Sequence, residues 1–260
     1  MDYNYHTHTF RCGHATGKEI DYVKRAVDCG VKYMGFSDHV PFVFPGGHED
    51  SYRVQMSDVK DYFETIRKLA NDFKDKIEIL VGFEAEFYPE FSEKMLKGAI
   101  DLGAQYLILG QHFIGNEVPD YVLSYSVYTD PEVLKKYTEC VISGMKTGLF
   151  TYVAHPDIVA FVGDNAVYDE QMRKICKKSK ELNVPLEINL LGIRENRKYP
   201  DQRFWKIAGE ENSPVTFGFD AHDVDAAYDG ESLKVAKEMV KKFALNYIGK
   251  PEIVRVDKAL

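Results

Sequence analysis

Histidines gather near the start of the sequence, in the stretch Met-Asp-Tyr-Asn-Tyr-His-Thr-His-Thr-Phe-Arg-Cys-Gly-His. Residues 3–9 are rich in aromatic and β-branched side chains, which predicts a short strand. His6 and His8 lie two positions apart, so their imidazoles would point to the same face of that strand. His14 follows after a turn at Gly13. Imidazole is a common metal ligand, so this spacing suggests a metal site, although a lone His-x-His pair also fits an ordinary structural role.

The remaining histidines strengthen the metal hypothesis because of where they fall. Of the eight histidines, all but His48 lie at or just past the end of a segment that predicts a strand; the later ones are His39, His112, His155 and His222. Carboxylates occupy similar positions, since Glu84 and Glu86 close one predicted strand and Asp220 closes another. Core histidines have no reason to collect at successive strand ends. The pattern therefore predicts a metal centre.

The segments that would carry these residues alternate between strand and helix along the whole chain. The predicted strands are 3–9, 33–39, 77–86, 106–112, 151–155, 185–189 and 215–219, and the helices between and after them are 18–29, 58–73, 91–102, 131–147, 168–182, 201–211 and 224–244. This alternation predicts parallel strands joined by helical crossovers, hence an α/β barrel or an open doubly wound sheet. Active sites of α/β barrels lie at the carboxyl ends of the strands, where the histidines fall.

No linker rich in proline, glycine or serine interrupts this pattern, so we predict one domain over residues 1–260. Residues 40–56 contain Pro41, Pro45, Gly46 and Gly47 and predict a long surface loop that could cover the site. The pattern leaves open whether residues 252–260 pack back as a strand or hang free.

The composition narrows the classes of partner and compartment. The chain has 33 basic and 41 acidic residues and a net charge of −8, which opposes binding to nucleic acid or to an anionic membrane. It shows no run of about 18 apolar residues and no pattern typical of a secretory signal. The four cysteines are scattered, so we expect free thiols and a cytoplasmic protein. Nothing in the sequence indicates an oligomeric state.

Six short motifs in this order resemble the polymerase and histidinol phosphatase (PHP) superfamily: His6-Thr-His8, Ser37-Asp38-His39, Gly82-Phe-Glu84, Gly110-Gln-His112, His155-Pro156-Asp157 and Asp220-Ala-His222. They span nearly the whole chain. Segments 10–14, 83–90 and 108–114 are similar to the histidinol-phosphatase branch in particular. The resemblance implies an α/β fold of the distorted (β/α)7 TIM-like barrel type, with a centre of three divalent metal ions.

The resemblance also implies which residues bind each ion. The first would be held by His6, His8, Glu84 and Asp220. Glu84 would bridge to a second ion held by His112 and His155, and the third would be held by His14, His39 and His222. Imidazole and carboxylate ligands suit zinc, manganese or iron, and the sequence does not choose among them.

The activity implied is hydrolysis of the phosphate monoester L-histidinol phosphate to L-histidinol and phosphate, a step of histidine biosynthesis. We expect a hydroxide bridging the first two metals to attack phosphorus, which makes Glu84 and Asp220 catalytic as well as ligating residues. One alternative is another phosphoesterase of the superfamily that acts on nucleotides or phosphotyrosine. A second is a metal-dependent amidohydrolase, since these enzymes also place His-x-His on the first strand of a barrel.

Candidate substrate contacts are less sharply indicated. Arg194 and Arg197 follow the sixth predicted strand and could clamp phosphate, because a guanidinium binds phosphate in a bidentate manner. We expect Arg194 to be the catalytically important one; a solvated basic loop is the alternative. His48 and Glu86 are candidates for contacts with the imidazole or amine of the substrate, against a plain structural role.

Overall fold

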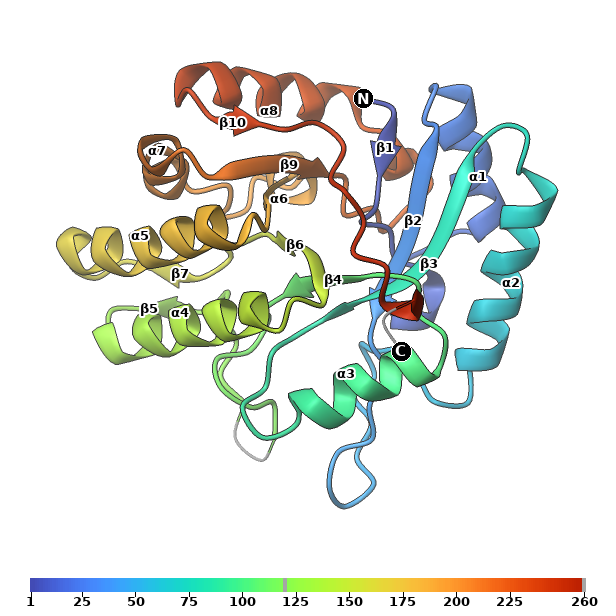
Figure 1. Cartoon of the computed structure of the whole chain (residues 1–260), viewed down its shortest axis with the longest axis horizontal. Coiled ribbons are helices and arrows are strands. Elements are labelled where there is room, and N and C mark those ends of the chain that lie inside the picture. The colour runs from blue at the N-terminus through green and yellow to red at the C-terminus, as the bar shows by residue number, and fades with distance from the viewer. Residues whose placement is uncertain (119–120, 259–260) are drawn as a thin grey trace.

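The computed structural model describes residues 1–118 and 121–258, which form a parallel α/β structure (Figure 1). In this part of the chain the main sheet has eight strands in the order β1-β2-β3-β4-β6-β8-β9-β10, and each neighbouring pair is parallel. Their bounds are β1 (Tyr3–Asn4), β2 (Tyr33–His39), β3 (Glu78–Ala85), β4 (Leu107–Gly110), β6 (Phe150–Ala154), β8 (Leu186–Asn189), β9 (Pro214–Gly218) and β10 (Asn246–Tyr247). Two further short strands, β5 (Val127–Tyr128) and β7 (Ala160–Phe161), pair separately.

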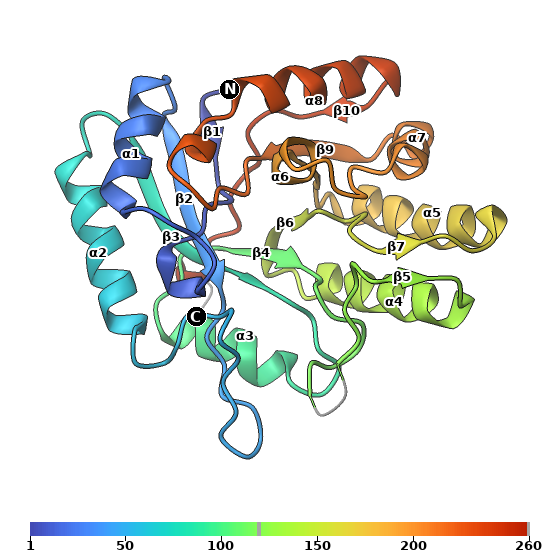
Figure 2. The same ribbon diagram turned by 180° about the vertical axis from the view of Figure 1, so that it is seen from behind.

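The helices connect successive strands and lie around the outside of the curved sheet (Figure 2). They are α1 (Glu19–Asp28), α2 (Val59–Asp72), α3 (Ser92–Asp101), α4 (Pro131–Lys146), α5 (Asn165–Leu182), α6 (Leu190–Arg194), α7 (Gln202–Glu211) and α8 (Gly230–Lys242), with 3-10 turns η1 (Phe10–Cys12), η2 (Asp225–Ala227) and η3 (Val256–Lys258). The predicted α/β class and distorted barrel are therefore confirmed. The seven predicted strands all form, and the short strands β5, β7 and β10 are additional in the described part of the chain.

The first strand is shorter than predicted because its second half closes the barrel. Tyr3 and Asn4 form its ladder with β2, and further along the Thr7 carbonyl accepts from the Ser37 N–H at 2.9 Å. Beyond them, Thr7 forms a parallel bridge with Ala221, and the His8 N–H donates to the Ala221 carbonyl at 2.9 Å. The segment that carries the His-x-His motif is thus held against the segment that follows β9, at the carboxyl rim of the barrel.

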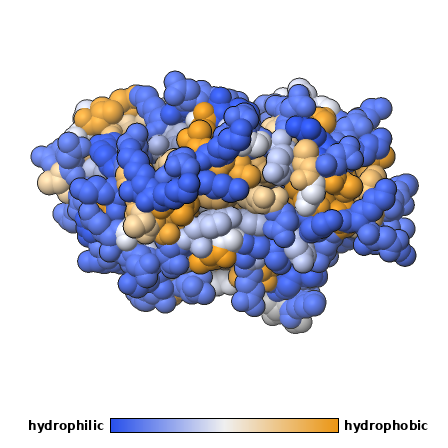
Figure 3. Space-filling view, turned by 90° about the horizontal axis from the view of Figure 1, so that it is seen from above, coloured by the Kyte–Doolittle hydropathy of each residue, from blue (hydrophilic) through white to orange (hydrophobic). Residues whose placement is uncertain are grey.

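Local sequence explains where several helices begin. Asp130, Asp164, Asp201 and Asp229 are the N-cap residues of α4, α5, α7 and α8, and each side chain accepts a hydrogen bond from a backbone N–H in the first turn. Each helix buries an apolar stripe against the sheet; in α2 the buried residues are Val59, Tyr62, Phe63, Ile66 and Leu69. The opposite faces are polar, and Figure 3 shows mostly hydrophilic side chains with separate apolar patches on the face that it presents.

The main apolar core is accompanied by a separate, smaller cluster in the interior of the barrel, made of Tyr3, Tyr5, Leu80, Tyr106, Ile108, Tyr152 and Ala154. Ile253 packs against this cluster, and the Val256 N–H donates to the Gln105 carbonyl at 3.1 Å. Val256 is fully buried. The end of the chain therefore packs back across the amino-terminal side of the barrel without adding a strand; its last two residues lie outside the described part. Within 1–118 and 121–258, no helix has the length and apolar character needed to cross a membrane.

Candidate metal centre

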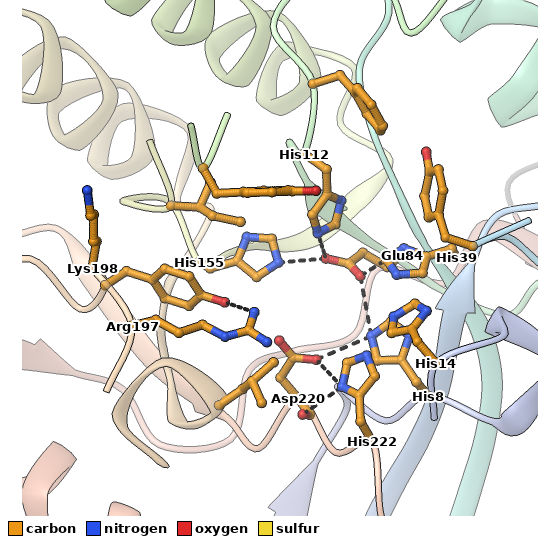
Figure 4. A pocket seen from close by; sticks show the side chains of 16 residues that line it. His8, His14, His39, Glu84, His112, His155, Arg197, Lys198, Asp220 and His222 are labelled. Carbon is orange, nitrogen blue, oxygen red and sulfur yellow. Dashed lines mark hydrogen bonds and ion pairs between the residues drawn. The ribbon is translucent and has the colours of Figure 1, made fainter. Parts of the chain in front are cut away.

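The residues at the strand ends meet in one pocket of about 700 Å³ at the carboxyl rim of the barrel (Figure 4). Parallel strands explain this convergence, because all their carboxyl ends face the same side. The pocket is lined by His8, His14, His39, Tyr52, Glu84, His112, Phe113, Tyr125, His155, Ile158, Leu191, Arg197, Lys198, Tyr199, Asp220 and His222. His6 lies beneath it and is fully buried.

The first group of candidate ligands surrounds a single point. The Nε2 atoms of His6 and His8 lie 3.5 and 3.4 Å from Glu84 Oε2, and 3.4 and 3.3 Å from Asp220 Oδ1. Ligand atoms that each lie ~2.1 Å from one zinc ion in a tetrahedron are about 3.4 Å apart. The four residues therefore have the spacing that one ion requires.

These same four atoms lack hydrogen-bond partners. His6 Nε2, His8 Nε2, Glu84 Oε2 and Asp220 Oδ1 are buried and have no partner within the described part of the chain. Buried polar atoms in proteins are almost always paired, so a group of four that point at one another needs an explanation. A divalent cation supplies it, and the donor set of two imidazoles and two carboxylates suits such an ion.

The other oxygen of Glu84 faces a second group. Glu84 Oε1 lies 2.8 Å from His155 Nε2 and 3.6 Å from His112 Nε2. A third group consists of His14, His39 and His222, each of which offers a nitrogen within 4.8 Å of the others. His39 Nδ1 also lies 3.3 Å from Glu84 Oε2. Glu84 thus sits between positions for more than one ion, as a bridging carboxylate would.

The cluster strongly perturbs the acid–base properties of its members. Burial raises the pKa of Glu84, but the imidazoles of His112 and His6 outweigh it and hold that pKa well below its usual range. Burial likewise opposes ionisation of Asp220, and His6 and His222 reverse the effect, so its pKa is also low. Burial and the neighbouring His8 lower the pKa of His222 to about 3. The same pairing raises the pKa values of His6, His8 and His112, so protons on these imidazoles balance the two carboxylates, and a bound cation would take the place of those protons.

Side chains behind the ligands fix the orientation of three imidazoles. Nδ1 of His6 lies 2.9 Å from Glu187 Oε1, Nδ1 of His8 lies 3.3 Å from Asp38 Oδ1, and Nδ1 of His112 lies 2.9 Å from Glu86 Oε1. A carboxylate at Nδ1 keeps the proton there and leaves Nε2 free to bind a metal.

Glu187 and Asn189 were not among the residues singled out from the sequence. Asn189 donates to Asp220 Oδ2 at 3.0 Å and to Glu187 Oε2 at 2.9 Å. The sequence did offer a signal for them: the buried strand β8, Leu-Glu-Ile-Asn, alternates apolar residues with these two polar ones at the same rim as the histidines.

Two of the ligands have unusual backbone conformations. His155 has φ of 30° and Asp220 has φ of 48°, in the left-handed region that non-glycine residues rarely adopt. His155 directly follows β6, and Asp220 lies two residues after the end of β9. Such conformations concentrate at functional sites, where the surrounding structure holds them.

The candidate substrate contacts are only partly brought together. Arg197 and Lys198 line the pocket, and Figure 4 shows the Arg197 guanidinium directed toward the side of the cluster that holds Asp220. Arg197 Nη1 donates to the Tyr199 hydroxyl at 2.9 Å. Arg194, which we expected to be the main clamp, instead contacts Asp229 and the backbone carbonyls of Phe219 and Asp220 and is not a lining residue. Arg194 is the last residue of α6, whereas Arg197 lies in the loop that follows the helix, so the two side chains meet different surroundings.

Glu86 and His48 also differ from expectation. Glu86 is fully buried behind His112 and contacts Arg53, so the structure does not place it at the mouth of the pocket. His48 lies outside the pocket in the projecting loop of residues 44–48, where its half-exposed side chain is 3.7 Å from Asp50 (light blue in Figure 1).

The PHP domain family model matches residues 4–190 of the chain. The chain belongs to the PHP domain family. The resemblance seen in the motifs is thereby confirmed, and the matched segment includes seven of the nine candidate ligands, from His6 to His155.

Individual proteins are similar to this chain over most of their own length. The chain is 28% identical to a probable histidinol-phosphatase of Deinococcus radiodurans, over 84% of this chain and 85% of the relative. It is 24% identical to the histidinol-phosphatase of Lactococcus lactis, over 99% and 96%. A crystal structure of histidinol phosphate phosphatase from Lactococcus lactis, complexed with zinc, L-histidinol and phosphate, superimposes with a TM-score of 0.73 at 20% identity and covers 99% of this chain and 98% of that one.

Proposed function

We propose that this PHP protein is a histidinol-phosphatase, which hydrolyses L-histidinol phosphate to L-histidinol and phosphate. The observation that carries the proposal is the position of Glu84, whose two oxygens face two separate imidazole groups at the floor of an open pocket. Several curated PHP relatives carry the name histidinol-phosphatase, and the Lactococcus structure was solved with L-histidinol and phosphate, which supports this substrate.

We further propose that the centre holds three divalent ions on His6, His8, His14, His39, Glu84, His112, His155, Asp220 and His222. Zinc is the first candidate because the Lactococcus enzyme was crystallised with it, and manganese and iron suit the same ligands. Ions bound there would offset the charge of a phosphate monoester and lower the pKa of a coordinated water toward ~7, so that a nucleophile exists at neutral pH.

The protein's own side chains would hold and orient the ester. Arg197 lines the pocket, where it contacts the Tyr199 hydroxyl and the Glu195 carboxylate, and it would donate to phosphate oxygens. Among the described lining residues the carboxylates are Glu84 and Asp220, and both face the histidine cluster. The imidazole and ammonium of the substrate would therefore meet Tyr52, Phe113 and Tyr125 rather than an acidic side chain. Aromatic faces can stack on an imidazole and attract an ammonium group.

The deciding experiment is phosphate release from L-histidinol phosphate by protein purified without chelator and supplied in turn with Mn²⁺ and Zn²⁺. We expect a kcat/KM well above that for p-nitrophenyl phosphate and nucleotide monophosphates. Activity on the general esters alone would keep the metal centre and remove the substrate. Absence of any phosphatase activity, in protein that carries fewer than two metals per chain, would favour the amidohydrolase alternative instead.

A further inference from the structure

An arginine is fully buried in a loop whose sequence predicts exposure. Arg53 belongs to the segment 40–56, yet only 1% of it is accessible to solvent. Its Nη1 donates to the Val40 carbonyl at 3.1 Å. Its Nη2 donates to Glu86 Oε2 at 2.9 Å and also contacts Glu117 Oε2. Burying a guanidinium is costly unless it is paired, so the two carboxylates are the reason this arginine can be there.

One of these two carboxylates reaches the metal centre and the other does not. Glu86 Oε1 lies 2.9 Å from His112 Nδ1, while its Oε2 accepts from Arg53. Glu117 accepts from Arg53, from the Tyr52 hydroxyl at 2.7 Å and from the Tyr88 hydroxyl, and within the described residues it makes no hydrogen bond or ion pair with an imidazole of the centre. Both carboxylates are at most 1% exposed. Arg53 therefore pairs with two buried carboxylates, and of these two only Glu86 contacts a candidate metal ligand, His112.

The second metal position is formed by Glu84, His112 and His155. It depends on the contact between Glu86 and His112 more than the first position depends on any one contact between a carboxylate and an imidazole. In the first position both imidazoles have a carboxylate at Nδ1, Glu187 for His6 and Asp38 for His8. In the second, His155 Nδ1 is buried with no partner in the described residues, so His112 is the imidazole held from behind.

We propose that Glu86, fixed in place by Arg53, is a positioning residue for His112 and sets the affinity of the second metal position. The proposal rests on the metal centre proposed above and adds to it which side chains outside the ligand set determine how tightly the second ion is held. Glu86 accepts the Nδ1 proton of His112, which leaves Nε2 unprotonated and directed toward Glu84. Without that acceptor, the imidazole can rotate or hold its proton on Nε2, and the second position loses a ligand.

The test compares Glu86→Gln with Glu117→Gln. Both substitutions remove one negative charge from beside the same guanidinium, so both should lower thermal stability by a similar amount. Each protein is stripped of metal and titrated with Co²⁺, followed by the visible absorption of the bound ion, and with Zn²⁺ against a competing chelator. We expect Glu86→Gln to lose about 10–100-fold in affinity for one ion per chain, and Glu117→Gln to keep the wild-type isotherm.

Equal isotherms for the two variants would overturn the proposal. A third variant, Glu86→Asp, keeps the charge paired with Arg53 but withdraws the carboxylate from His112 Nδ1, so it should fold and still show the weakened position. A wild-type chain that binds no more than one ion would instead overturn the proposed metal centre, and with it this inference. The two failures are therefore distinguishable.

Discussion

At the scale of single residues, Glu84 illustrates how one side chain organises a site. It is 1% exposed, and its two oxygens lie within 3.6 Å of nitrogens from five histidines, His6, His8, His39, His112 and His155. An isolated buried carboxylate would take up a proton to avoid the cost of burial, but here the imidazoles keep its pKa low. Its charge is therefore available to cations at two positions.

Arg197 and Arg194 differ by three positions, and the structure predicts different consequences for them. Arg197→Ala removes a guanidinium that lines the pocket, so we expect kcat/KM for L-histidinol phosphate to fall by about 10–100-fold, in the range of lost charge-assisted hydrogen bonds. Arg194→Ala removes contacts with Asp229 and the backbone near Asp220, so its main effect should be on thermal stability. Steady-state kinetics and thermal unfolding of both variants check this, and a larger kinetic loss for Arg194→Ala would contradict the assignment.

Tyr125 tests recognition of the organic part of the substrate. It lines the pocket and is not one of the candidate ligands. Tyr125→Leu should raise KM for L-histidinol phosphate by about 5–10-fold, as expected for losing ~1 kcal/mol of aromatic contact, and leave glycerol 2-phosphate hydrolysis unchanged. If both substrates weaken equally, the ring supports the pocket rather than the substrate.

At the scale of secondary-structure elements, glycines in strands leave room for the ligands. A Cβ atom on Gly110, at the end of β4, would lie 1.9 Å from Glu84 Oε1, whereas a Cβ on Gly98 in α3 would meet nothing within 4 Å. Gly110→Ala should therefore displace Glu84 and lower the metal content of the purified protein. Gly98→Ala should keep its metal and gain roughly 0.5–1 kcal/mol of stability, because alanine favours the helix. Metal analysis and thermal unfolding compare them; normal metal content in Gly110→Ala would show that the strand can move aside.

Asp157 links the loop after β6 to the start of α7. Its Oδ2 accepts from the Asp201 N–H at 2.6 Å and from Trp205 Nε1 at 2.9 Å, and burial raises its pKa from the ordinary value of 3.8 to about 7. The folded protein thus binds this proton more tightly than the unfolded chain does. Its stabilising contribution is complete below pH 3.8 and is lost as the pH rises through about 7.

Asp157→Asn should remove that part of the pH dependence and still accept both hydrogen bonds. At ~1.4 kcal/mol per pKa unit, the variant should gain on the order of a few kcal/mol relative to wild type between pH 4 and pH 8. Urea unfolding at several pH values, with chelator present, measures the difference. Asp130→Asn makes the same chemical change at an exposed helix cap and serves as the control, so parallel curves for Asp157→Asn and wild type would refute the argument.

At the scale of the whole molecule, the metal centre joins segments that are distant in sequence, from His6 to His222. Ions that bind the folded chain and not the unfolded chain stabilise it by mass action, by ~4 kcal/mol at a thousand times the dissociation constant. For a chain of 260 residues this corresponds to about 10 °C in Tm. We therefore expect chelation to lower Tm by that order, reversibly on addition of Zn²⁺ or Mn²⁺. Asp220→Asn should respond less, and equal shifts would mean that the stabilising ion binds elsewhere.

The sequence alone predicted the candidate ligands and the parallel alternation that brings them to one rim. Both follow from local rules, because side-chain periodicity reveals strands and helices, and crossovers force successive strand ends to the same side. His6, His39, His112 and His155 therefore meet as expected. Their roles as ligands stay predictions until metal is measured.

Only the tertiary structure decided which polar side chains serve the ligands and which face the substrate. Arg53, from a segment predicted as a surface loop, pairs with Glu86 33 positions away, and Glu187 reaches His6 across 181 positions. Arg194 and Arg197 look equivalent in sequence and meet different surroundings because α6 ends at Arg194 and Arg197 lies in the loop beyond it. Such pairings depend on packing between segments distant along the chain, and no local periodicity encodes them.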